Sequence, residues 1–174
     1  TPIVVNDTRG FYVNRCVLRY MSESYQMLIE GVPAPMIENA AKMAGMPVGP
    51  LALTDETAID LAQKIMKQTI RDLGEKAVDM DQFALVNTMV DKHGRHGRKN
   101  GKGFYDYPEK PAKKHLWAGL KDLYPQQDAD EIDVEDLKQR FLVTIALEAA
   151  RVMEEGIVTD PREADVGSIL AFGF

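Results

Sequence analysis

The chain has 174 residues, of which 45% are hydrophobic and 28% charged, which is typical of a folded globular protein and excludes a disordered one. Its formal net charge of −6 provides no general attraction for phosphate backbones, so a nucleic-acid partner is not expected. The single cysteine, Cys16, excludes a disulfide framework and favours a reducing compartment such as the cytoplasm, and no apolar stretch approaches the roughly 20 residues of a membrane span.

The beginning of the sequence predicts a short extended run and two helices. Residues 3–5 are β-branched and end at the turn signal Asn6-Asp7. From about Val13, apolar residues recur at steps of three and four, which indicates a helix that Gly31 ends. Its expected apolar face consists of Leu18, Met21, Tyr25, Leu28 and Val32. Pro33-Ala34-Pro35 is expected to open a second helix that runs to about Met43.

The middle of the sequence alternates loops and helices. Residues 45–50 contain two glycines and two prolines, which predicts an irregular loop. A long helix is expected over 57–73 and another over 82–91, because both stretches show helical spacing of apolar residues. The polar and basic stretch 93–100 predicts a loop, followed at 101–107 by a tight turn into a short extended segment.

The last third predicts a linker and the strongest helix of the chain. Prolines and lysines after residue 108 are typical of a linker. Residues 128–136 carry many carboxylates but lack the ligand spacing and central glycine of an EF-hand calcium loop. We therefore interpret them as an acidic approach to a helix over 134–155, since acidic side chains stabilise a helix N-terminus.

An internal repeat appears when the sequence is shifted by about 125 residues. Its polar matches pair Arg15 with Arg140, Glu23 with Glu148, Glu30 with Glu155, and Gly31 with Gly156. Apolar positions also coincide, for example Leu18 with Val143 and Tyr20 with Ile145. Both copies continue into a proline-led segment, at Pro35 and Pro161, but the second copy stops at Phe174. Because each helical unit alone would leave an apolar face uncovered, the two units are expected to pack together.

The repeat gives the expected organisation of the chain. It predicts an all-α fold with a first complete helical unit at 1–108, a linker at 109–132 and a partial second unit at 133–174. The first residue is not a methionine and the last residues are apolar, so we expect the sequence to be part of a longer protein.

Three ordered motifs resemble one known family. They are the stretches 3–7 and 10–15, the loop 45–50 with Leu51 and Asp55 after it, and the closing Gly-Lys-Gly-Phe-Tyr-Asp-Tyr at 101–107. This arrangement resembles the C-terminal domain of 3-hydroxyacyl-CoA dehydrogenases. The second copy, with Glu154-Glu155-Gly156 and the stretch 164–168, resembles the duplicated C-terminal domain of the multifunctional enzymes of fatty-acid β-oxidation.

The resemblance implies an activity that this chain cannot perform alone. The family passes a hydride between a 3-hydroxyacyl thioester and NAD, but no Gly-x-Gly-x-x-Gly follows a strand in this sequence. An NAD-binding domain elsewhere in the same polypeptide is therefore expected to bind NAD and to carry the catalytic histidine. The partners implied are that domain and an acyl-CoA substrate, and the isolated fragment is expected to be inactive.

The resemblance also assigns candidate site residues. Asn14 matches the family's catalytic asparagine, whose amide faces the substrate and the catalytic histidine. Gln139 occupies the corresponding place in the second copy, so one catalytic and one structural copy are expected. Without the resemblance, Asn14 would be interpreted as a helix cap, and we expect it on the packing side of its helix. The predicted substrate-binding residues are Phe11, Met46, Pro47, Gly49, Pro50 and Leu51, although the loop at 45–50 could also be a plain helix connector.

Two departures from the family pattern affect the expected shape of the substrate groove. Arg9 precedes Gly10-Phe11 where the family usually has proline. Thr57-Ala58-Ile59-Asp60 stands where the family commonly has a Val-Gly-Leu-Asp type of segment.

Other features of the sequence allow alternative functions. The basic loop, which contains Arg95, Arg98, Lys99 and Lys102, could bind phosphates, although a soluble turn is the simpler interpretation. His93 and His96 have no third ligand nearby, so no metal site is expected. The competing hypothesis for the whole chain is a non-catalytic helical module for protein interaction, with the duplicated units or a homodimer serving only association.

Overall fold

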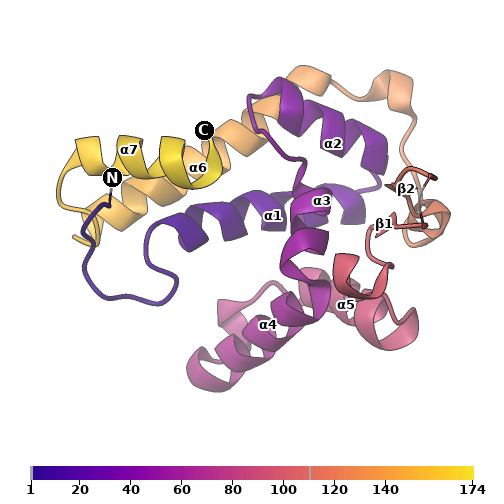
Figure 1. The fold of residues 1–174 in the computed structure, drawn as a ribbon, viewed down its shortest axis with the longest axis horizontal. Helices are drawn as coiled ribbons and strands as arrows, with labels where there is room; N and C mark the ends of the chain where they lie inside the picture. Colours follow the sequence, from indigo (N-terminus) through magenta and orange to yellow (C-terminus); the bar gives the residue numbers. More distant parts are fainter. Residues whose placement is uncertain (1, 110) are drawn as a thin grey trace.

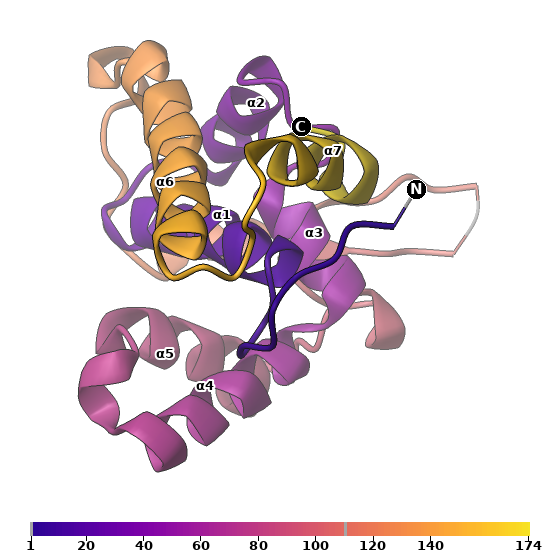
Figure 2. The same ribbon diagram turned by 90° about the vertical axis from the view of Figure 1, so that its left-hand side faces the viewer.

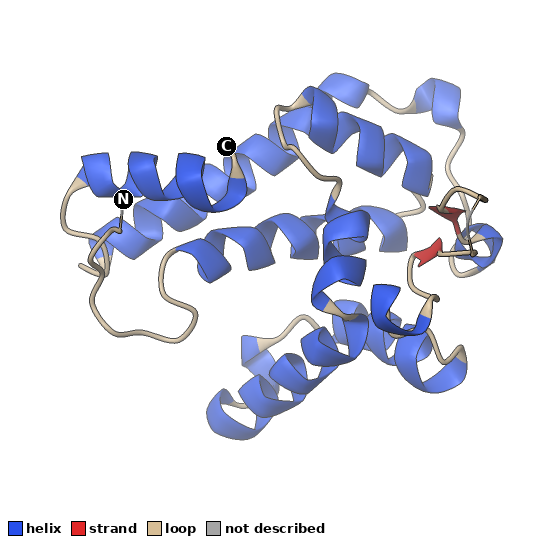
Figure 3. Cartoon of the chain, viewed as in Figure 1, coloured by secondary structure: helices blue, strands red, loops and turns tan. Residues whose placement is uncertain are grey.

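The structure, a computed structural model, describes residues 2–109 and 111–174. Thr1, at the start of the predicted first unit, and Lys110, in the predicted linker, lie outside the described residues. Helices are the main secondary structure of the described chain (Figures 1 and 3), as predicted, and they are joined by loops and one small two-stranded sheet. Its helices are α1 (Val13–Ile29), α2 (Ala34–Met43), α3 (Pro50–Thr57), α4 (Ile59–Leu73), α5 (Met80–Asn87), α6 (Val134–Glu154) and α7 (Pro161–Phe172).

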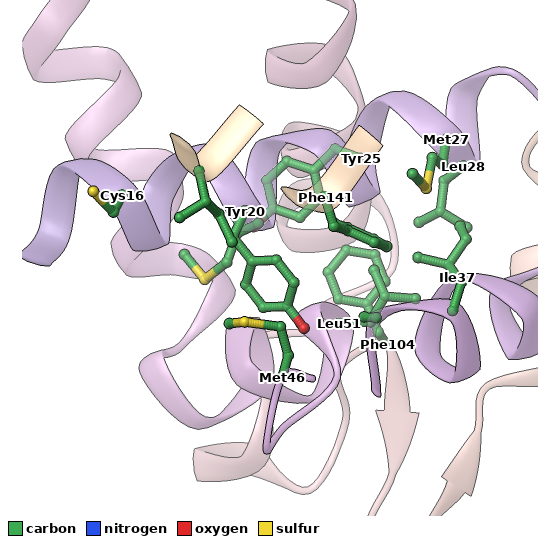
Figure 4. Packing of buried hydrophobic residues seen from close by; sticks show 14 of the residues in the cluster. Cys16, Tyr20, Tyr25, Met27, Leu28, Ile37, Met46, Leu51, Phe104 and Phe141 are labelled. Atoms are coloured by element: carbon green, nitrogen blue, oxygen red, sulfur yellow. The ribbon is translucent and has the colours of Figure 1, made fainter. Parts of the chain in front are cut away.

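Helices α1 and α6 form the centre of the fold. They lie against each other along much of their length and bury a mixed aromatic and aliphatic core (Figure 4). The Tyr20 ring of α1 meets the Phe141 ring of α6, with centroids 5.2 Å apart in a tilted arrangement. On the other side of α1, Tyr25 stacks on Phe104 at 5.9 Å. Side chains from both predicted units therefore share one core.

The two units are related by an approximate twofold axis. Helix α1 contacts α7 and α2 contacts α6, which are equivalent pairings under the repeat. The ion pairs are reciprocal as well. Arg15 pairs with Glu148 and Glu155 of the second unit, and Arg140 pairs with Glu23 and Glu30 of the first. This is the arrangement of an isologous dimer interface, here formed within one chain.

The segments outside the helices also cross between the units. Asn6 donates from its backbone N–H to the Ile157 carbonyl at 2.8 Å and from its side chain to the Gly156 carbonyl at 2.7 Å. In the other direction, Gln127 donates from its backbone N–H to the Gly31 carbonyl at 2.9 Å. The segment before α1 thus holds the turn that follows α6, and the segment before α6 holds the turn that follows α1.

Helices α4 and α5 lie on the opposite side of α1 from α6 and α7 (Figures 1 and 2). The predicted helix over 57–73 corresponds to α4, which starts two residues later, but the separate helix α3 that precedes it was not predicted. The break is at Ala58, which has a φ of 79°. The predicted helix over 82–91 corresponds to α5 and to the π-type turn Thr88–Lys92 that continues it.

Two predictions about extended and linker segments need correction. Residues 3–5 form no strand: the hydrogen bonds to the second unit are made by Asn6, after this segment, and Ile3 packs against Gly167 of α7. The predicted linker is folded where the structure describes it. Its strand β2 (His115–Leu116) pairs antiparallel with β1 (Tyr105–Asp106), and Leu120 is buried in the core. We therefore propose the boundaries 1–108, 109–132 and 133–174 as boundaries of the sequence repeat. They do not separate independent packing units, because the three parts share one core.

The acidic residues before α6 have the predicted structural role. The Asp133 side chain accepts a hydrogen bond from the Glu135 backbone N–H at 2.8 Å and caps the helix. Glu135 and Asp136 lie in its first turn, where negative charge is favourable. Among the helices that the structure describes, none is long and apolar enough to cross a membrane.

Candidate functional site

The first two turns of α1 expose an apolar surface with an amide in it. Phe11 is 51% exposed and Leu18 is 38% exposed. Asn14 lies between them in sequence and is also exposed, one helical turn before Leu18. We call these three residues the α1 face. Their exposure leaves the Asn14 amide and both apolar side chains available for contact with a ligand or another domain.

The chain enters α1 through a tight reversal that presents the α1 face. Gly10 has a φ of 83° and Phe11 a φ of 50°, so two successive residues adopt the left-handed region. Just before the reversal, Arg9 pairs with Asp72 of α4 at 2.5 Å. The departure of Arg9 from the family pattern therefore has a structural consequence, because this arginine links the entry segment to the end of α4.

Asn14 does not cap its helix. The N-cap position is Tyr12, and no side chain makes a capping hydrogen bond there. Asn14 also does not face the repeat's packing surface as expected, because that surface of α1 carries Cys16 and Tyr20, both fully buried. Leu18 was expected on the same apolar face and is likewise turned outward. The structure thus removes the capping interpretation and leaves the Asn14 amide available on the outside.

The predicted substrate loop lies mostly inside the protein. Met46, Gly49, Pro50 and Leu51 are buried. The Tyr20 hydroxyl donates to the Val48 carbonyl at 2.7 Å, which attaches the loop to the inner side of α1 (Figure 4 shows Tyr20 beside Met46). These four residues pack the loop against the rest of the protein. Pro47 is exposed, but it lies beside Gly173 near the C-terminus.

Two buried carboxylates hold the loop and the closing motif in place. Glu38 of α2 accepts hydrogen bonds from the Leu51 backbone N–H at 2.7 Å and from the Tyr105 hydroxyl at 2.7 Å. It thereby satisfies the free N–H groups at the start of α3, which has no cap of its own. A Cβ atom at Gly49 would lie 2.2 Å from Glu38, so this position in the loop requires glycine.

Asp55 of α3 has the equivalent role for the closing motif. Its carboxylate accepts hydrogen bonds from the backbone N–H groups of Phe104 and Tyr105, both at 2.8 Å, and from the Tyr107 hydroxyl at 3.0 Å. Burial raises the pKa of Asp55 to about 6 despite these bonds. A Cβ atom at Gly103 would lie 2.0 Å from Asp55, which explains the glycine there. These carboxylates are therefore structural, although their buried position resembles that of a reactive group.

The role of Glu38 was missed in the sequence. The available signal was a charged residue placed between Ile37 and Ala41 on the apolar face of a helix. Such a residue must find hydrogen-bond donors inside the fold, because an unpaired buried carboxylate is costly.

The basic loop makes contacts within the protein. Arg95 is buried, donates to the Gly103 carbonyl at 2.6 Å and lies over the Trp117 ring at 4.3 Å. Arg98 pairs with Glu56 at 2.7 Å, and Lys99 pairs with Asp60. The phosphate-binding interpretation is therefore not favoured, since these three cations already contact protein carbonyls, carboxylates or an aromatic ring.

Neither a metal nor NAD has a suitable set of residues in the described part of the chain. No group of three or more potential ligands is placed to hold a metal there, and the His93 ring packs on Trp117 at 4.9 Å. The strands β1 and β2 have two residues each and are antiparallel. The described residues thus do not form the parallel strand, glycine-rich turn and helix that cradle a dinucleotide pyrophosphate.

The helical fold, with its signature loops held by Glu38 and Asp55, defines the class of protein. The chain belongs to the family of 3-hydroxyacyl-CoA dehydrogenase C-terminal domains, whose model matches residues 10–107. The predicted family and the all-α fold are therefore confirmed.

Particular relatives are alpha subunits of bacterial fatty acid oxidation complexes. The chain is 41% identical over 177 residues to the one from Shewanella loihica and 37% identical over 174 residues to the one from Vibrio parahaemolyticus. Each alignment covers 100% of this chain and 24% of the relative, so the chain spans about a quarter of the length of these relatives.

Two solved structures share the fold. The dehydrogenase part of multifunctional enzyme 1 from C. elegans superposes with a TM-score of 0.70 at 22% identity, covering 99% of this chain and 39% of that one. The 3-hydroxybutyryl-CoA dehydrogenase from Escherichia coli superposes with a TM-score of 0.68 at 20% identity, covering 100% of this chain and 52% of that one. Because both matches extend over α6 and α7, the fold is shared beyond the residues that the family model matches.

Proposed function

We propose that this chain is the substrate-side domain of an NAD-dependent 3-hydroxyacyl-CoA dehydrogenase of fatty-acid β-oxidation. The observation that carries the proposal is the α1 face, where the Asn14 amide stands exposed between Phe11 and Leu18. An amide that neither caps its helix nor packs in the core is available to a substrate and to a neighbouring domain. Family membership and the relatives' names support the reaction class.

The proposed role of Asn14 is to bind the reacting oxygen of the substrate. Its NH₂ group can donate to an oxygen on which negative charge builds, and its carbonyl can accept from an imidazole. The rest of the longer polypeptide would bind NAD and carry the catalytic histidine, since the described residues form no dinucleotide site. Phe11 and Leu18 would contact the acyl-CoA or the NAD-binding domain. The loop at 45–51 stays a prediction as an acyl-binding element.

The lone, buried Cys16 agrees with a reducing compartment, and we propose a cytoplasmic location. The alternative interaction module is less well supported. The twofold arrangement that such a module would use for association is already formed between α1 and α6 of one chain.

The test is a comparison of variants in the longer protein that contains this chain. NADH oxidation with acetoacetyl-CoA is measured for the native protein, for Asn14→Ala and for Gln139→Ala. Loss of one donor to a developing oxyanion lowers kcat by about 100-fold, so we expect this for Asn14→Ala. Gln139→Ala, the matched change in the second copy, should leave kcat unchanged. Unchanged kcat in a folded Asn14→Ala protein would contradict the assignment.

The isolated chain provides a second check. The 174-residue chain should show no NADH turnover with acetoacetyl-CoA, because its sequence contains no Gly-x-Gly-x-x-Gly fingerprint for NAD. Turnover by this chain alone would overturn the proposed division of labour.

A further inference from the structure

The first turn of α1, which carries Asn14, lacks the side-chain features that usually stabilise the start of a helix. Tyr12 provides no capping hydrogen bond, and the first turn contains no acidic residue. The preceding Phe11 is in the left-handed region, which costs conformational energy for a non-glycine residue. The position of this turn must therefore come from contacts with other elements.

Those contacts come mainly from the second unit. The Arg15 Nε atom donates to Glu148 Oε1 at 2.7 Å, and its other nitrogens donate to Glu155. The Tyr12 hydroxyl lies 2.6 Å from the Ser168 hydroxyl of α7. The guanidinium fork of Arg15 thus spans two carboxylates of α6, and this geometry restrains both translation and rotation of the turn.

Glu148 is the centre of this network. Its side chain is only 3% exposed, and it also accepts hydrogen bonds from Arg19 at 3.2 Å and Arg151 at 3.4 Å. Burial by itself would raise the pKa of Glu148, but the bonds and charges of Arg15 and Arg19 together hold it below its ordinary value. Glu148 is therefore ionised in the folded protein at neutral pH and serves as a fixed anion for α1.

We propose that Glu148 is a positioning residue for Asn14, acting through Arg15. The second unit, which lacks the asparagine, would thus determine where the α1 face presents its amide to the substrate. This inference rests on the proposed function of Asn14. Glu148→Gln removes the buried one of the two anions that hold Arg15 and leaves only the exposed Glu155, so Arg15 and the turn next to it would shift.

The repeat provides a matched control. Glu23 accepts a hydrogen bond from Arg140 at 2.7 Å, in the same geometry as Glu148 with Arg15. Arg140, however, follows Gln139 and not an asparagine. A change at Glu23 should disturb the first turns of α6 but leave the turn that carries Asn14 in place.

The experiment measures kcat and KM for the longer protein with Glu148→Gln and with Glu23→Gln, using acetoacetyl-CoA and NADH. A shift of about 1 Å in a reacting group lowers turnover by one to two orders of magnitude, so Glu148→Gln should lower kcat by about tenfold or more. Its KM should change much less. Glu23→Gln should keep kcat within about twofold of the native value. Equal losses in both variants, or native kcat in Glu148→Gln, would overturn the proposal.

Hydrogen exchange separates this proposal from the proposed function. In the 174-residue chain, Glu148→Gln should increase exchange in the peptide covering 11–19, and Glu23→Gln should increase it in 136–144. If the native longer protein has no dehydrogenase activity, the proposed function fails, while the exchange pattern still tests the link from Glu148 to the turn. Unchanged exchange at 11–19 in Glu148→Gln would refute that link.

A variant on the surface covers the case in which Glu148→Gln does not fold. Glu155 is 50% exposed and holds the other side of the Arg15 fork. Glu155→Gln should fold and lower kcat by about threefold, whereas Glu30→Gln, its counterpart beside Arg140, should not. Native kcat in Glu155→Gln together with native exchange at 11–19 would also refute the proposal.

Discussion

Ala58 occupies a backbone conformation that L-residues rarely adopt. Its φ is 79° and its ψ is 124°, at the junction of α3 and α4. The resemblance implies a Val-Gly-Leu-Asp type of segment here, with glycine in place of Ala58, and glycine adopts positive φ without steric penalty. We predict that Ala58→Gly raises the free energy of unfolding by about 1 kcal/mol, because relief of the strain exceeds the added chain entropy of glycine.

The measurement is equilibrium unfolding in urea, with Ala62→Gly as control. Ala62 lies in the regular part of α4, where the same chemical change should lower the free energy of unfolding by about 1 kcal/mol. If both variants lose stability equally, Ala58 is not strained.

At the candidate site, the sequence predicted which residue matters but not the side of the helix on which it lies. Asn14 was selected from a motif, and the structure shows it exposed. The prediction that Asn14 faces the packing surface is wrong. Asn14 and Leu18 are four residues apart, and this spacing was interpreted as part of a buried apolar stripe. Only Cys16, Tyr20 and their neighbours face α6, since the covered side of α1 depends on a helix more than a hundred residues later.

At the scale of elements, two glycines at equivalent turns have different surroundings. Gly31 ends α1 with a φ of 89°, and Gly156 ends α6 with a φ of 70°. A Cβ atom at Gly31 would lie 2.2 Å from the Pro125 carbonyl oxygen, whereas a Cβ atom at Gly156 would have nothing within 4 Å. Both changes to alanine add backbone strain, but only Gly31→Ala also forces the segment around Pro125 away.

We predict that Gly156→Ala lowers the free energy of unfolding by about 1 kcal/mol, the cost of a left-handed alanine. Gly31→Ala should lower it by about 3 kcal/mol, because the displaced backbone also loses hydrogen bonds. Urea unfolding of the two variants measures the difference. Equal losses would mean that the segment at 125–127 moves aside at no cost, so the crossing contact would contribute nothing to stability.

The elements themselves were predictable to different degrees. Helices α1, α2 and α6 have a clear apolar face or a proline start, and the predicted ranges match them. Helix α3 was missed because it is short and buried on several sides, so its apolar residues show no period. The break before α4 was missed as well, because alanine, here Ala58, carries no turn signal in a sequence.

At the scale of the whole molecule, the two units form one core. Tyr20 and Phe141 are both fully buried, and each is covered partly by the other unit. We predict that a chain ending at residue 108 does not unfold cooperatively, because loss of α6 and α7 exposes the central side of α1. Calorimetry and near-UV circular dichroism provide the measurement. The full 174-residue chain should show a single transition.

A cooperative transition in the chain ending at 108 would contradict this prediction. It would show that the first unit folds independently, so the proposed boundary would then mark a true structural domain.

The sequence alone determined the helical class, the repeat and the family, because helical periodicity and glycine-proline loops are local properties of the chain. It also indicated that the two copies would pack together, since each leaves an apolar face uncovered. Only the tertiary structure showed that Arg15 and Arg140 each form ion pairs with carboxylates of the other copy. It also decided that Met46 and residues 49–51 are buried while Asn14 is exposed. These features depend on which residues distant in sequence cover each side chain, and no local pattern contains that information.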